Sequence, residues 1–164
     1  MKASKLALLS LAVTLAMILS FVESQIPAMV AIPGVKVGLA NIAVVFILYK
    51  LGWKYAAVVS LTRVFLVGLL FGNGVSLLYS VAGAVVSFVS MVLLKRCKAF
   101  SYVAVSVCGG VMHNMGQIAM ACIVMGTTAL KYYIPFLLLS GTLAGIVIGL
   151  LAAVMVRRVA LSAA

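Results

Sequence analysis

Acidic residues are almost absent from this sequence. Glu23 is the single carboxylate side chain among 164 residues, against twelve Lys and Arg and one His. A prenyl or phosphoryl transferase that holds divalent metal ions needs several carboxylates, so this chain alone is not such an enzyme. It also lacks a phosphate-binding Gly-rich loop with its Lys. We therefore expect no catalytic residues, no cofactor and no nucleotide site.

Cysteine and charged residues are also scarce. Cys97, Cys108 and Cys122 are odd in number and have no CxxC spacing, which predicts neither a disulfide framework nor a metal site. Only 8% of residues are charged, whereas 67% are hydrophobic and the mean hydropathy is +1.39. Soluble domains have about 25% charged residues. The composition therefore predicts a membrane protein, whose basic residues face lipid head groups rather than nucleic acid.

Six apolar runs predict an all-α membrane protein, a six-transmembrane-helix bundle forming one domain over residues 1–164. At roughly 20 residues per crossing, the chain is long enough for about six membrane helices. The first run is predicted to be a retained helix, because no small-x-small cleavage site follows it. The predicted helices cover 5–22, 37–50, 54–72, 75–94, 99–126 and 132–156.

The segment from Glu23 to Lys36 is predicted to be irregular. Pro27 and Pro33 exclude a continuous helix there. The second apolar run is too short to cross a hydrocarbon core of about 30 Å. Part of this loop is therefore expected at membrane depth, where irregular backbone must be buried in protein or line a cavity.

The basic residues predict the orientation. With a cytoplasmic N-terminus, only Lys36 and Lys131 fall on the outer side, while Arg63 lies inside the third run. Basic residues concentrate in cytoplasmic loops, so both termini are predicted to be cytoplasmic, in the cell membrane. The cytoplasmic set is Lys2, Lys5, Lys50, Lys54, Lys95, Arg96, Lys98, Arg157 and Arg158.

Arg63 and Glu23 are the ionisable residues of greatest interest. Arg63 falls near the middle of its run, where an unpaired guanidinium costs at least about 2.5 kcal/mol. It is expected to face the bundle interior, either bonded to carbonyls and amides or binding an anionic or carbonyl-rich ligand. Glu23 is expected to pair with Lys36 or Arg63, or to face a ligand.

Polar residues also cluster in the fifth run. His113 and Gln117 lie one turn apart on one face and Asn114 is adjacent. Such groups avoid lipid, so they are predicted to contact a ligand or to hydrogen-bond neighbouring helices. Asn41, at the start of the second run, is a further ligand candidate. Gly141, Gly145 and Gly149 form a small-residue stripe that lets another helix approach closely.

Two motifs carry a resemblance to a known family. They resemble the membrane family labelled heptaprenyl diphosphate synthase component I, or Gx transporter, over nearly the whole chain. That family resembles the substrate-binding S components of energy-coupling factor (ECF) importers. The motifs are Glu23-Ser24-Gln25-Ile26-Pro27 with Pro33-Gly34-Val35-Lys36-Val37-Gly38-Leu39-Ala40-Asn41, and Gly110-Val111-Met112-His113-Asn114-Met115-Gly116-Gln117.

The resemblance implies an ECF S-component-like bundle with a ligand pocket near its outer face and no enzymatic activity. It implies that Ala12 and Ala16, an AxxxA pair, dock a coupling membrane subunit that works with two ATPase subunits. The implied substrate is a vitamin-like, isoprenoid or quinone- or flavin-related small molecule. The alternative is a non-transporting scaffold subunit of a prenyl-chain or flavin-linked electron-transfer assembly. The implied pocket residues are Glu23, Lys36, Asn41, Arg63, His113, Asn114 and Gln117.

Overall fold

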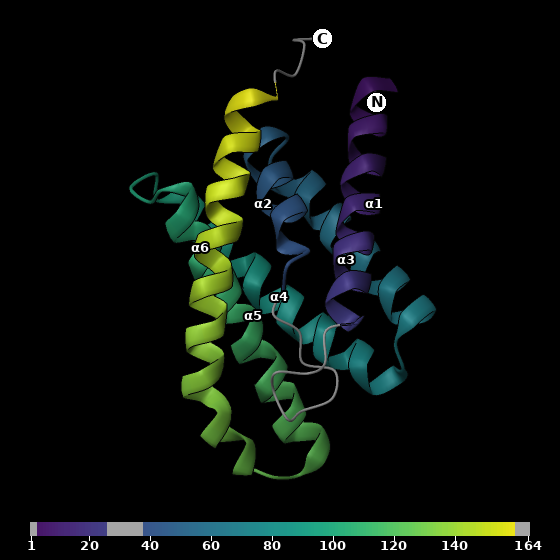
Figure 1. Ribbon diagram of the computed structural model, residues 1–164, viewed down its shortest axis with the longest axis vertical. Helices are drawn as coiled ribbons and strands as arrows, with labels where there is room; N and C mark the ends of the chain where they lie inside the picture. Colours follow the sequence, from purple (N-terminus) through teal and green to yellow (C-terminus); the bar gives the residue numbers. More distant parts are fainter. Residues whose placement is uncertain (1–2, 26–37, 160–164) are drawn as a thin grey trace.

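The computed structural model describes residues 3–25 and 38–159, and these residues form a helical bundle (Figure 1). Six α-helices and one short 3-10 helix, η1, make up the described part, which contains no strand. They are α1 (Ala3–Gln25), α2 (Asn41–Lys50), α3 (Trp53–Phe71), α4 (Gly74–Arg96), α5 (Tyr102–Met125), η1 (Ala129–Tyr133) and α6 (Ile134–Arg158). The helical class and the approximate helix positions agree with the prediction. The segment 26–37, which contains Lys36, lies outside the described residues.

Five of these helices are long and apolar enough to cross a membrane: α1, α3, α4, α5, and α6 together with η1. The described residues therefore form an all-helical bundle of the kind found in membrane proteins. Helix α2 is different, because its ten residues extend only about 15 Å. It reaches roughly halfway across a hydrocarbon core of about 30 Å, so six complete crossings remain a prediction.

The helices alternate in direction. One apolar cluster joins the first part of α1, all of α2, the starts of α3 and α5 and the ends of α4 and α6. A second cluster joins the starts of α4 and α6 to the end of α5. The start of α1 and the end of α6 accordingly lie at the same end of the bundle (Figure 1). The first cluster includes Leu9, Tyr49, Tyr55, Leu94 and Met155.

Short polar and glycine signals fix the helix ends. The Asn73 side chain accepts a hydrogen bond from the Ser76 N–H at 2.8 Å and caps α4. Ser101 caps α5 in the same way. Helix α5 ends at Gly126, whose left-handed conformation is typical of a C-terminal cap. These signals set the lengths of the membrane-spanning helices.

Helices α5 and α6 approach each other closely along the predicted glycine stripe. A Cβ atom added to Gly145 would lie 2.5 Å from the Val107 Cα atom, and one added to Gly149 would lie 2.6 Å from the Val103 Cα atom. The prediction of a small-residue contact between helices is thus confirmed. Backbone packing of this kind replaces the hydrophobic effect, which provides no driving force between helices in lipid.

Ala12 and Ala16 are buried inside the bundle. They are 6% and 0% exposed and belong to the apolar cluster that α1 forms with α2 and α3. Both alanines thus pack inside the bundle in this structure, and docking of a coupling subunit through them stays a prediction. The AxxxA spacing is used within the chain, where small side chains let α1 pack against its neighbours.

Candidate ligand-binding site

Arg63 lies near the middle of α3 and points into the bundle. It is 5% exposed, and its Nη1 atom donates a hydrogen bond to Ser20 Oγ at 3.4 Å. Its Nη2 atom donates to Asn41 Oδ1 at 3.2 Å. The guanidinium thus joins α3 to α1 and α2 at membrane depth. Because a charge without polar partners is costly there, these hydrogen bonds are the kind of contacts expected for it.

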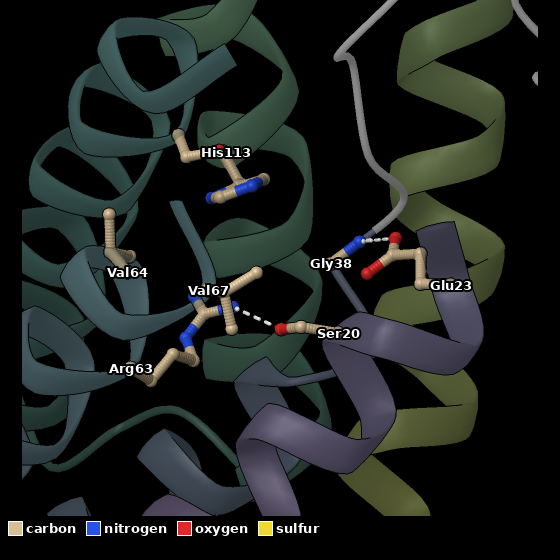
Figure 2. A pocket seen from close by; sticks show the side chains of 8 residues that line it. Ser20, Glu23, Gly38, Arg63, Val64, Val67 and His113 are labelled. Atoms are coloured by element: carbon tan, nitrogen blue, oxygen red, sulfur yellow. Dashed lines mark hydrogen bonds between the residues drawn. The ribbon is translucent and has the colours of Figure 1, made fainter. Parts of the chain in front are cut away.

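Glu23 lies beside this cation at the end of α1. Its carboxylate is 7% exposed and accepts a close hydrogen bond from the Gly38 N–H (Figure 2). Its negative charge also attracts Arg63. Of the partners predicted for Glu23, Arg63 is therefore an electrostatic neighbour, whereas Lys36 lies outside the described residues.

Gly38 is positioned by its backbone. Its φ is +93°, in the region that favours glycine. A Cβ atom there would lie 3.2 Å from Asn41 Nδ2 and 3.6 Å from His113 Cδ2. The chain entering α2 consequently passes close to α5 and to the polar side chains around Arg63.

A small cavity lies between these groups. Side chains from α1, α3, α4 and α5 face it, with His113 opposite the Glu23–Gly38 contact and Arg63 extending from α3 towards Ser20 of α1 (Figure 2). Its volume is about 10 Å³, which is room for about one water molecule. It is lined by Ser20, Glu23, Gly38, Arg63, Val64, Val67, Ser80 and His113.

Two buried donors near the cavity have no hydrogen-bond acceptor among the described residues. They are Arg63 Nε and Asn41 Nδ2. A buried donor without an acceptor costs about 1–3 kcal/mol. The cavity therefore has unused donor capacity, which suits a molecule with oxygen acceptors.

Asn114 and Gln117 lie outside the cavity lining. Asn114 Nδ2 donates to the Leu137 backbone carbonyl at 2.8 Å and to Ser140 Oγ at 3.4 Å, and so joins α5 to α6. Gln117 is fully buried and packs over Gly83 of α4. Both side chains therefore make contacts between helices, and their predicted contact with a ligand stays a prediction.

The structure thus brings together Glu23, Asn41, Arg63 and His113 from the predicted set. It also adds Ser20 and Gly38, which sequence analysis missed. Ser20 precedes Glu23 by three residues, so both lie on one face of α1, and this spacing is a signal that was available in the sequence. Gly38 participates through its backbone N–H, which no side-chain pattern reveals. The described residues contain no group of three or more potential metal ligands.

Comparison with known proteins identifies a family. The family model described as heptaprenyl diphosphate synthase component I matches residues 12–155. The matched range includes every described residue that lines the cavity. Neither a curated protein nor a solved structure matches the chain.

Proposed function

Because the chain belongs to the heptaprenyl diphosphate synthase component I family, we propose that it is a membrane-embedded substrate-binding subunit of an ECF-type importer. Its substrate would be a vitamin-like, isoprenoid or quinone- or flavin-related small molecule. The observation that carries the proposal is the polar cavity around Arg63 at membrane depth. Ionisable residues inside membrane proteins usually mark binding or transport pathways.

The position of α2 supports this proposal. Helix α2 begins beside the cavity, and the hydrogen bond from the Gly38 N–H to Glu23 lies at its approach. Discontinuous helices that begin at membrane depth are typical of transporter binding sites. The chain would bind substrate without chemistry of its own, and partner ATPases would supply the energy.

One purification experiment tests the proposal. We expect the native protein, extracted in mild detergent, to retain a small molecule detectable by mass spectrometry. We also expect it to co-purify with a coupling membrane subunit and two ATPases. Absence of the coupling subunit and the ATPases would refute the importer function, and absence of the small molecule would refute substrate binding.

A pair of variants locates the site. Arg63→Gln should release the bound molecule, whereas Lys131→Gln, which removes the same charge from an exposed position, should retain it. Size-exclusion chromatography checks that Arg63→Gln is folded. Retention of the molecule by folded Arg63→Gln would place the binding site elsewhere.

A scaffold function is the second candidate. It is favoured by the small size of the cavity and by the burial of Ala12 and Ala16. The family name refers to one component of a synthase, so a scaffold would bind another component of a prenyl-chain enzyme. Co-purification with such a component, without ATPases and without a bound small molecule, is the result expected for this function.

We further propose that both ends of the chain face the cytoplasm in the cell membrane. Cys97 is exposed at the end of α4, on the basic side of the bundle. A membrane-impermeant maleimide should label it in inverted vesicles but not in intact cells. Thr128→Cys, at the opposite end of the bundle, should show the reverse pattern in a Cys97→Ser background. Labelling of Cys97 in intact cells would reverse the proposed orientation.

A further inference from the structure

A second cavity lies beside the polar one, between α3 and α4. Its volume is about 170 Å³. It is lined by Ala57, Ser60 and Leu61 from α3 and by Ala84, Val85, Phe88 and Val89 from α4. Its lining is apolar apart from Ser60. Several of these side chains, including Leu61 and Val89, are about half exposed, so the cavity opens towards lipid as a groove.

The packing of α4 explains the groove. Near the turn between α3 and α4, Gly68 lies against Leu77, and an added Cβ atom would clash with that side chain at 2.5 Å. Farther from the turn, Gly83 and Gly116 bring α4 against the backbone of α5. Helix α4 therefore follows α5 and separates from α3.

The groove and the polar cavity are adjacent along the same two helices. On α3, Ser60 of the groove lies one turn from Arg63 of the polar cavity. On α4, Ala84 of the groove lies one turn from Ser80 of the polar cavity. An apolar space open to lipid thus borders a polar space with unused hydrogen-bond donors.

We propose that these two cavities together bind one uncharged amphiphile, an apolar molecule with an oxygen acceptor at one end. Its hydrocarbon part occupies the α3–α4 groove, and its hydroxyl or carbonyl oxygen enters the polar cavity. The oxygen accepts a hydrogen bond from Arg63 Nε, which has no acceptor among the described residues. This proposal rests on the proposed binding function and specifies its ligand class.

The volumes set the shape of this ligand. A dry cavity of about 150 Å³ binds benzene, so the groove has room for a ring or about one isoprene unit. The polar cavity has room for about one water molecule. A single oxygen atom fits this space, whereas a diphosphate group does not.

The charges agree with an uncharged ligand. Among the residues that line the polar cavity, Arg63 contributes one positive charge and Glu23 one negative charge, so the pair is neutral. A multiply charged phosphate would add negative charge that no further cation among the described lining residues balances, at a depth where unbalanced charge is costly. The geometry therefore favours a prenyl alcohol or a prenylated quinone over a prenyl diphosphate.

Binding to the purified full chain in phosphatidylcholine nanodiscs tests the proposal. The probe is tritiated farnesol, with farnesyl diphosphate, farnesane and a farnesyl-tailed benzoquinone as competitors. These molecules share the farnesyl carbon skeleton and differ in the group at its end. We expect saturable binding of tritiated farnesol that is displaced by unlabelled farnesol and by the farnesyl-tailed benzoquinone. The quinone competitor tests whether the site accepts a carbonyl oxygen as well as a hydroxyl oxygen. Competition by farnesane as strong as by farnesol, or stronger competition by the diphosphate, would overturn the proposal.

A matched pair of variants tests the groove. Ala57→Phe fills it without changing a residue that lines the polar cavity and should weaken farnesol binding about tenfold or more. Val58→Phe adds the same ring at the same depth, at a position that is 54% exposed outside the groove, and should bind like the wild type. Equal binding by Ala57→Phe and wild type would overturn the proposed position.

The two proposals fail differently. Farnesol binding without associated ATPases would overturn the importer function and leave the ligand class intact. Associated ATPases with a bound molecule that farnesol does not displace would overturn the ligand class alone.

Discussion

The buried charges of Arg63 and Glu23 are expected to stabilise the fold as a pair. Arg63→Met leaves the Glu23 carboxylate buried at 7% exposure without its neighbouring cation. It also removes the donors to Ser20 and Asn41. Because Arg63 interacts with Glu23 through their charges and removal of one charge leaves the other buried at a cost, we expect a loss of about 3 kcal/mol in the free energy of unfolding, part of it from the lost hydrogen bonds.

Glu23→Gln is the complementary change. An amide oxygen can still accept the hydrogen bond from the Gly38 N–H, but the Arg63 charge loses its compensation. We expect a loss of about 3 kcal/mol again. The double variant removes both charges, and its main loss among the described residues is the set of hydrogen bonds from Arg63 to Ser20 and Asn41, each worth about 1 kcal/mol.

The double-mutant cycle separates pairing from independent contributions. Unfolding free energies from denaturant titration in detergent should show that the double variant is more stable than the sum of the single losses predicts, by about 1–3 kcal/mol. Losses that add within about 0.5 kcal/mol would refute the pairing of Glu23 with Arg63. In that case each residue would be stabilised by its hydrogen bonds alone.

Three further variants test the packing. Gly145→Ala should lower the free energy of unfolding by about 1–2 kcal/mol because the added Cβ atom meets the α5 backbone. As a control, Gly74→Ala should not destabilise the protein, because a Cβ atom at that position has no other atom within 4 Å. Asn114→Leu should cost about 1 kcal/mol while ligand binding is unchanged; loss of binding in a folded protein would assign Asn114 to the ligand. Ala16→Leu should destabilise the protein by about 1–3 kcal/mol, and Ala7→Leu, at an exposed position on the same helix, should be neutral in thermal unfolding.

Hydropathy and glycine spacing predicted most of the fold. The long apolar runs became helices whose ends lie within a few residues of the prediction, because a spanning helix must satisfy its own backbone hydrogen bonds in lipid. The glycine stripe on α6 was confirmed as a close contact with α5. The start of α2 was less predictable, since the structure places it at Asn41, four residues after the predicted start.

The site was only partly predictable, because hydrophobic periodicity identifies buried positions but not their neighbours. The cluster of His113, Asn114 and Gln117 was expected to act together. All three are buried, but Asn114 faces α6 while His113 and Gln117 pack against Gly83 of α4, since adjacent residues on a helix point about 100° apart. Only His113 lines the polar cavity, whereas Asn114 contacts α6. The AxxxA pair on α1 shows the same limit, because a small-residue spacing suits contacts within the chain as well as contacts with a partner.

The short length of α2 connects the fold to the proposed ligand site. A full-length second helix would fill the space beside Arg63 with side chains and satisfy its own backbone N–H groups. Because α2 begins at Asn41, the Gly38 N–H donates to Glu23, and the Asn41 side chain can accept from Arg63. These two contacts join α1, α2 and α3 around one neutral polar cluster. Extending α2 would therefore remove the cavity, so the break before α2 is a condition for binding at this depth.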